Sequence, residues 1–344
     1  MMNKKNKNFI EEIRKDLVSR EWILVSSIRG RGKKPNFLSK KKKVPKKDTK
    51  KNCPFEDPQK SGNPKPIIWF AKKEAKSFND WFIQVIPNKY PMLLKSDICP
   101  TISHYGPYEK IEAVGFHEVI IMRDHNKPIE RMSLEEIILI LKAYRQRYKM
   151  LEKNKCVEYV LIFHNQGESA GATIEHPHSQ LVAMPIIPPD VSRSINGGIN
   201  FYKKNKKCVH CTMIDYERKE GKRIVAKNPY FITICPYTSR VSYETRIFPI
   251  EHSSDFEEIS DKELVYLAHS LKDALHRISK ALKNPDYNFF IHTASAKVKD
   301  IPYYHWHIEI LPRTYKWAGV ELGTGVEVVV VPPEEAAGHL RSVF

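Results

Sequence analysis

The sequence predicts an α+β fold built from two similar halves, each an antiparallel sheet with one long helix against it. Two observations support this prediction. The same order of strand-like apolar runs, one long helix and further strands occurs twice along the 344 residues, as expected of a repeated unit. Both predicted helices also open with the same capping pattern, and strands on either side of a single helix suit an antiparallel sheet.

The first half has its long helix between two groups of strands. The helix is expected to begin after Ser133, because Glu136 follows three residues later and completes a capping box. The apolar runs around it have the length and composition of buried strands. In chain order the predicted elements are strands at 82–87 and 116–125, the helix to about Glu152, and strands at 157–164 and 181–185.

The second half repeats this order. Its helix is expected after Ser260, with Glu263 in the capping position. A proline cluster at 185–190 marks the boundary, so the predicted units are 1–190 and 191–344. The corresponding elements are strands at 231–236 and 243–252, the helix to about Lys283, a strand at 287–292, and a closing segment at 305–309 that parallels 176–180.

The composition is that of a folded globular protein, with 41% hydrophobic and 10% aromatic residues. The net charge of +17 would suit nucleic-acid binding. Much of the excess, however, lies in a lysine-rich loop at about residues 38–52, which lacks the interleaved aromatic residues that stack on bases. Nucleic acid is therefore not the expected partner.

The sequence also bears on location. No apolar run is long enough to span a bilayer, and no apolar segment follows the basic start of the chain, as it would in a secretory signal. The six cysteines do not form the pattern of a disulfide framework, and Cys208 and Cys211 have the spacing of metal ligands. We therefore expect a cytoplasmic protein without a membrane partner.

The segment at residues 165–180 carries the chemistry. His176 and His178 flank a proline that fixes the backbone between them, and two glycines precede them. Glycine lets the backbone approach an anionic ligand closely. An imidazole that is partly unprotonated near neutral pH is a good nucleophile toward phosphorus. These residues predict a site for phosphoryl chemistry.

This segment, with Asn165, two glycines, Thr173 and His-Pro-His-x-Gln in order, resembles the signature of the galactose-1-phosphate uridylyltransferase family, a branch of the histidine-triad superfamily. In that family two histidine-triad units are fused and related by a pseudo-two-fold axis. Further segments that resemble the family lie at residues 85–91, 305–312, 316–325 and 332–341.

The resemblance implies that His178 attacks the α-phosphorus of a nucleoside diphosphate sugar and forms a nucleotidyl-histidine intermediate, which a second sugar phosphate resolves. Gln180 would donate to a phosphoryl oxygen. The hydrolytic histidine-triad enzymes have histidine at this position. Because glutamine cannot activate water as a base, it favours transfer over hydrolysis. In the second half, Glu309 at the equivalent position would repel phosphate, so we expect that half to be catalytically silent.

Other residues are expected to bind substrate. Backbone and side-chain groups of the signature would contact phosphates. By resemblance, a basic segment contacts phosphate, an asparagine contacts the nucleoside, and two C-terminal residues close the site of a neighbouring subunit in a homodimer. The expected substrate-binding residues are Arg31, Lys34, Asn88, Asn165, Gly167, Gly171, Thr173, Lys316 and Glu321; Lys34 is a looser match, since the family usually has arginine there.

One or two structural zinc sites are expected. The first, by resemblance, comprises Cys53, Glu56, His125 and His176, with Glu56 standing where the family usually has cysteine. The repeat predicts a second set, Cys208, Cys211, His252 and His305, all good zinc ligands. An alternative second site, implied by some family members, would draw on His292, His305 and His307.

The leading interpretation is an enzyme that moves UMP from UDP-glucose to galactose 1-phosphate. The base and the sugar come from the resemblance alone. The alternative is a related phosphorylase or adenylyltransferase that uses ADP-glucose or a dinucleoside polyphosphate through the same histidine. A more remote alternative is a non-catalytic nucleotide or nucleic-acid binding module that keeps the fold.

Overall fold

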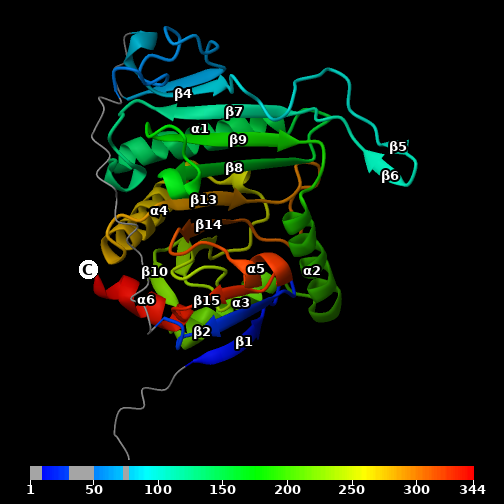
Figure 1. Cartoon of the computed structure of the whole chain (residues 1–344), viewed down its shortest axis with the longest axis vertical. Coiled ribbons are helices and arrows are strands. Elements are labelled where there is room, and N and C mark those ends of the chain that lie inside the picture. The colour runs from blue at the N-terminus through cyan, green and yellow to red at the C-terminus, as the bar shows by residue number, and fades with distance from the viewer. Residues whose placement is uncertain (1–9, 31–49, 73–76) are drawn as a thin grey trace, which may run out of the picture.

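The computed structural model describes residues 10–30, 50–72 and 77–344, and its centre is one ten-stranded antiparallel sheet (Figure 1). Across the sheet the strands are β3 (Ile68–Ala71), β4 (Trp81–Pro87), β7 (Phe116–Met122), β9 (His178–Met184), β8 (Tyr159–Gln166), β13 (Tyr287–His292), β14 (His307–Pro312), β12 (Thr245–Pro249), β11 (Phe231–Ile234) and β10 (Ile224–Lys227).

The strand order confirms the predicted repeat. Each half contributes five strands, and the order in one half mirrors the order in the other from the seam outward. β8 and β13 pair at the centre, where Phe163 lies opposite Phe290. The two sheets expected from the sequence are therefore one continuous sheet with a pseudo-two-fold relation between its halves.

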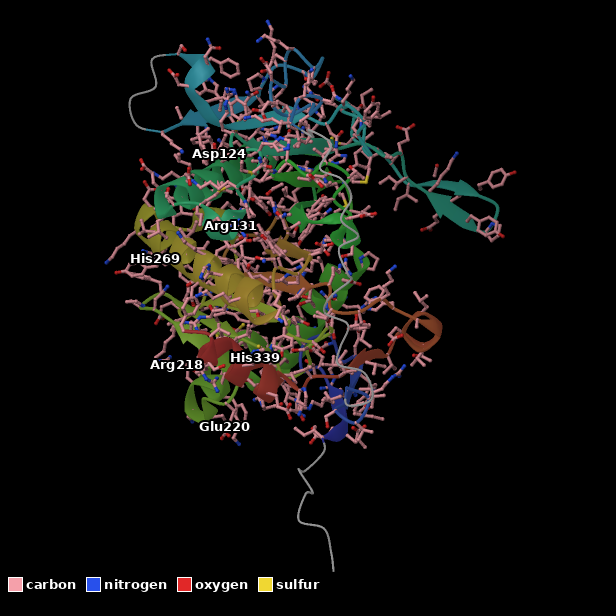
Figure 2. The ribbon with its side chains drawn as sticks, turned by 60° about the vertical axis from the view of Figure 1, so that its left-hand side comes forward. Asp124, Arg131, Arg218, Glu220, His269 and His339 are labelled. Atoms are coloured by element: carbon pink, nitrogen blue, oxygen red, sulfur yellow. A yellow bond between two sulfur atoms is a disulfide. The ribbon has the colours of Figure 1, made fainter. Side chains whose placement is uncertain are left out.

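Both long helices were predicted correctly and lie on one face of the sheet. They are α1 (Leu134–Leu151) and α4 (Asp261–Ala281), and each begins with the expected capping box, at Ser133 and Ser260. Their apolar sides form one core with the strands. Figure 2 shows this helical face, with His269 labelled on the outer side of α4.

The other face of the sheet is covered only in part. A small sheet of β1 (Glu11–Lys15), β2 (Trp22–Ser26) and β15 (Glu327–Val329) lies in the second half, and a two-stranded hairpin of β5 (Ser103–Tyr105) and β6 (Tyr108–Lys110) projects from the body (Figure 1). The remaining helices are α2 (Pro189–Asn205), α3 (Val209–Glu220), α5 (Gly319–Thr324) and α6 (Pro333–Ser342).

Two findings concern the expected environment of the chain. None of the helices in the described ranges is long and apolar enough to cross a membrane. Cys99 and Cys156 form a disulfide, which the sequence analysis did not anticipate because the two cysteines lie 57 residues apart and belong to no recognisable spacing pattern.

Candidate active site and metal centres

His178 begins β9 and is 7% exposed. Its Nδ1 lies 2.8 Å from the carbonyl oxygen of His176. A carbonyl oxygen only accepts, so Nδ1 carries the proton and Nε2 keeps its lone pair. Burial lowers the pKa of His178, which favours the neutral ring. The geometry therefore gives His178 the state that a nucleophile needs.

Ser179 points to the opposite face of β9 and fixes the strand against α1. Its hydroxyl contacts the hydroxyl of Tyr144 and lies 3.0 Å from His164 Nδ1. Burial lowers the pKa of His164 to about 3, so this ring is neutral. The sequence analysis missed His164 and Tyr144, although the alternation of side chains along β9 could have assigned Ser179 to the helical face.

Gln180 shares the open face of the sheet with His178. Its Oε1 lies 2.8 Å from His117 Nε2, and Asn88 Nδ2 lies 3.1 Å from the same nitrogen. The structure thus brings two predicted residues, Gln180 and Asn88, together through a histidine of β7 that the sequence analysis missed. Alternation along β7 was the available signal, because it separates His117 from the helix-facing Glu118.

The loop after β8 carries the other signature residues. Asn165 Oδ1 accepts a hydrogen bond of 2.7 Å from Asn288 Nδ2. Gly167 and Gly171 both have positive φ, of 85° and 87°, which glycine adopts at low cost. Thr173 is exposed. The loop therefore lies next to His178, since Ser179 pairs with β8 one residue before Asn165.

Four predicted residues remain, and only two of them are described. Arg31 and Lys34 lie outside the described residues. Lys316 and Glu321 are carried by an exposed segment around α5, which Figure 1 places in the second half, away from β9. Among the described contacts, none links these two residues to His178 or Gln180.

A first cluster of side chains that could hold a metal ion adjoins His178. Cys53 Sγ lies 3.5 Å and His125 Nδ1 3.1 Å from His176 Nδ1. His176 Nε2 donates to the carbonyl oxygen of Met122 at 2.6 Å, so its Nδ1 lone pair faces the cluster. Glu56 Oε2 is buried without a hydrogen-bond partner and lies 3.3 Å from His125 Nδ1. The ligand atoms of Cys53, His125 and His176 lie within 4.8 Å of one another, and one sulfur with two imidazole nitrogens suits a metal ion. Glu56, the predicted fourth ligand, contacts the histidines but is not part of this closest group.

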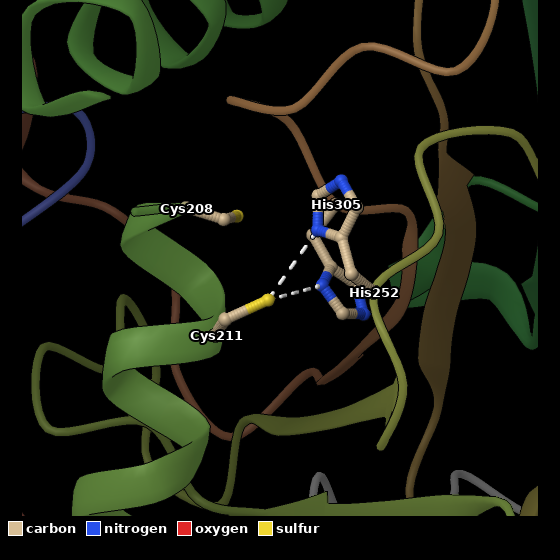
Figure 3. Close-up of side chains that lie close together, drawn as sticks. All are labelled: Cys208, Cys211, His252 and His305. Carbon is tan, nitrogen blue, oxygen red and sulfur yellow. Dashed lines mark hydrogen bonds between the residues drawn. The ribbon is translucent and has the colours of Figure 1, made fainter. Parts of the chain in front are cut away.

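The second cluster is the predicted Cys-Cys-His-His set (Figure 3). Cys208 and Cys211 lie at the start of α3, and Cys211 Sγ is 3.3 Å from His252 Nδ1 and 3.5 Å from His305 Nδ1. Each ring Nε2 lies 3.1 Å from a backbone carbonyl oxygen. This is how metal-ligating histidines are oriented. The hydrogen bond from Cys211 lowers the pKa of the Cys208 thiol, as a thiolate ligand requires.

The three histidines of the alternative second metal site, His292, His305 and His307, do not form one cluster in the structure. His305 belongs to the second metal set, whereas His292 and His307 lie beside Glu309. Arg240 and Arg246 form ion pairs with Glu309. Burial raises the pKa of Glu309, but the two guanidinium groups outweigh this effect and lower that pKa to about 2.

This charged group lines a cavity of about 420 Å³ in the second half. The two guanidinium groups already pair with the Glu309 carboxylate, and a carboxylate, unlike the amide of a glutamine, offers no N–H to a phosphate. The cavity therefore lacks the geometry seen around His178, where a neutral glutamine stands at the position of Glu309.

Fused units of this kind, with a paired-histidine strand at the open face, define a histidine-triad type of protein. A model of the galactose-1-phosphate uridyl transferase N-terminal domain matches residues 1–188, and one described as a domain of unknown function matches residues 113–342. The chain belongs to the galactose-1-phosphate uridylyltransferase family, as the resemblance predicted.

Three relatives show how similar the chain is to known proteins. The ADP-glucose phosphorylase of Arabidopsis thaliana is 32% identical over 96% of this chain and 93% of that protein. The galactose-1-phosphate uridylyltransferase of Thermotoga maritima is 31% identical over 74% of this chain and 82% of that protein. A crystal structure of the Arabidopsis phosphorylase with bound ADP-glucose has a TM-score of 0.80 and 29% identity, covering 97% of this chain and 100% of that one.

Proposed function

We propose that the protein transfers a nucleoside monophosphate from a nucleoside diphosphate sugar through a covalent adduct on His178, with ADP-glucose as the donor and orthophosphate as the acceptor. The observation that carries the transfer is the neutral His178 ring, with Nδ1 tied to a carbonyl oxygen and Nε2 free. The donor and acceptor are supported by the ADP-glucose phosphorylase that is similar to nearly the whole chain.

The proposed reaction proceeds in two displacements. In the first, His178 Nε2 forms a bond to the α-phosphorus, the bond to the bridging oxygen breaks, and glucose 1-phosphate leaves with that oxygen. In the second, an orthophosphate oxygen attacks the same phosphorus, the bond to Nε2 breaks, and ADP is released. Gln180 serves both steps as a neutral hydrogen-bond donor.

The second candidate is the transfer of UMP from UDP-glucose to galactose 1-phosphate. The family model and the Thermotoga relative favour this candidate. Both candidates use His178 in the same way, so they differ only in the base that is bound and in the acceptor that resolves the adduct.

Incubation with ADP-glucose or UDP-glucose without acceptor, followed by intact-mass analysis, separates these candidates. We expect an adenylyl adduct that orthophosphate discharges faster than galactose 1-phosphate does. A uridylyl adduct discharged by galactose 1-phosphate would favour the second candidate. His178→Ala should form no adduct, and His178→Gly should regain turnover with added imidazole. His276→Ala, on the helical face, is the matched control. The absence of an adduct from every donor would contradict the proposal and leave a binding module.

We further propose zinc as the metal at both clusters, because sulfur and imidazole ligands suit it. Elemental analysis of the purified protein tests this, and Cys211→Ser should lose the metal of the second cluster. Protein without zinc would contradict it.

The proposal includes a cytoplasmic location, which thiolate ligands at Cys208 and Cys211 support. The Cys99–Cys156 disulfide favours an oxidising compartment instead. Thiol labelling of protein taken directly from cells distinguishes the two. A labelled Cys99 would agree with the cytoplasm, and a blocked one would contradict it.

A further inference from the structure

His117 receives a hydrogen bond that determines where its proton lies. The backbone N–H of Met92 points at His117 Nδ1 at 3.2 Å. A backbone N–H can only donate, so Nδ1 must be the accepting nitrogen. In the ring that accepts this bond, the proton therefore lies on Nε2.

The position of that proton fixes the orientation of the Gln180 amide. His117 Nε2 lies 2.8 Å from Gln180 Oε1, and an N–H donor there requires the amide oxygen of Gln180 to face it. The amide nitrogen of Gln180 must then point away from His117. Since Gln180 and His178 lie two residues apart on the same face of β9, this nitrogen is presented on the side of the nucleophile.

The proton on His117 Nε2 also restricts the hydrogen bonding of Asn88. Its Nδ2 lies 3.1 Å from His117 Nε2, but both atoms are donors, so no hydrogen bond joins them. Its Oδ1 accepts the backbone N–H of Tyr90 at 2.8 Å, which keeps the amide in this orientation. The N–H groups of Asn88 are therefore left for another acceptor.

We propose that His117 is a positioning residue for nucleotidyl transfer: its Nε2–H tautomer holds the Gln180 amide so that an N–H, and not the carbonyl oxygen, faces the phosphoryl group at His178. This inference rests on the proposed function and adds a residue to it. With the opposite tautomer, the amide would turn its oxygen toward the phosphate and repel it.

The tautomer can be measured without activity. Long-range ¹⁵N–¹H spectra of protein labelled with ¹⁵N-histidine report which ring nitrogen is protonated, and the signal lost in His117→Ala assigns the ring. We expect the proton on Nε2. A proton on Nδ1 would overturn the proposal, even if the protein forms the adduct. Conversely, failure to form any adduct would overturn the proposed function while this spectrum still decides the state of His117.

A double-mutant cycle then tests whether His117 acts through Gln180. His117→Ala should slow adduct formation about 10- to 100-fold, as loss of an orienting partner commonly does, with a smaller change in donor affinity. In a Gln180→Ala background the same substitution should change the rate less than about threefold, because the residues act as a unit. An equal loss in both backgrounds would show that His117 does not act through Gln180 and would overturn the proposal.

His117→Gln provides the conservative variant, since its terminal amide can still donate toward Gln180. We expect it to recover part of the rate lost in His117→Ala, and it serves as the test should the alanine variant fail to fold. A His117→Gln rate no higher than that of His117→Ala, in folded protein, would count against the proposal. His276→Ala is the matched control, because this half-buried ring stacks on Phe344 at 5.1 Å between centroids, on α4, and should leave the rate unchanged.

Discussion

Gly167 and Gly171 share a positive φ, of 85° and 87°, but they differ in ψ, which is 163° at Gly167 and 12° at Gly171, and in their surroundings. A Cβ at residue 167 would lie 2.0 Å from Asp286 Oδ1, whereas at residue 171 the nearest atom would be Asn165 Nδ2 at 3.9 Å. Asp286 also accepts the backbone N–H of Ser169 at 2.9 Å. The signature loop is therefore anchored at its first glycine and open at its second.

Alanine substitutions at these two glycines measure how strongly each position is restricted. Gly171→Ala should lower the free energy of unfolding by about 1–2 kcal/mol, the cost of a left-handed alanine. Gly167→Ala should cost about 1–3 kcal/mol more, because the added methyl group displaces Asp286 and because the backbone at residue 167, with ψ of 163°, lies in a region that only glycine readily adopts. Urea unfolding measures both values. Equal losses would contradict the stronger restriction of residue 167.

At this scale, the contiguous part of the site could be predicted and the rest could not. His178 and Gln180 lie in one short motif, and the residue types in that motif indicate phosphoryl chemistry. His117 precedes Gln180 by 63 residues, and Asp286 follows Ser169 by 117. Only the pairing of strands brings them together, and one sequence does not contain that pairing.

At the scale of the elements, the N-terminus of α1 is stabilised by ion pairs as well as by its capping box. Glu136 is 2% exposed, and besides capping Ser133 it forms ion pairs with Lys72 at 2.5 Å and Lys127 at 2.7 Å. Burial raises the pKa of Glu136, but the hydrogen bonds from the two lysines outweigh this effect and lower that pKa to about 2. Glu263 occupies the equivalent position of α4 in a more exposed capping box.

This contact makes the stability of α1 depend on pH. Because the pKa of Glu136 in the folded state lies below its ordinary value of 4.5, its stabilisation is present above pH 4.5 and is lost as the pH falls toward 2. Glu136→Gln should lower the free energy of unfolding by about 1.5–3 kcal/mol near neutral pH. The difference from the unmodified protein should shrink below pH 4.5.

Urea unfolding at several pH values measures this difference, and Glu263→Gln is the matched control with a smaller expected effect. A difference for Glu136→Gln that stays constant down to pH 2 would contradict the assignment.

The elements also show why some predictions were incomplete. The capped helices and the apolar strands were found, but α2 was not predicted, and its start falls within the proline cluster at 185–190 that was taken as the boundary. The helix also contains Gly197 and Gly198. A Cβ at residue 197 would lie 1.8 Å from the carbonyl oxygen of Val18, and one at residue 198 would lie 2.3 Å from that of Tyr303. Glycine here permits close packing of the helix on two backbone segments, although by propensity it argues against a helix.

At the scale of the whole molecule, one chain does not bring all the predicted substrate-binding residues together. Lys316 and Glu321 lie on the exposed segment around α5, whereas His178 lies in the first half. We propose a homodimer in which this segment closes the site of the partner. The exposed side chains of Trp317 and Leu322 would then be covered by the second copy.

Mixing two inactive variants tests this arrangement. In a dimer of His178→Ala and Lys316→Ala chains, one of the two sites would contain both unmodified residues. Co-expression should therefore restore turnover that neither variant has alone, and sedimentation should show a dimer. Each variant expressed alone is the control. A monomer, or a mixture without activity, would contradict the proposal.

The pairing of β8 with β13 gives the second half a structural role. If the first half stood alone, β8 would be an outer strand with free backbone N–H and C=O groups, and such strands recruit other chains into aggregates. In the fused molecule β13 occupies those groups permanently. The second half, with Glu309 where the first half has Gln180, therefore covers a strand edge that would otherwise be open to pairing with another chain.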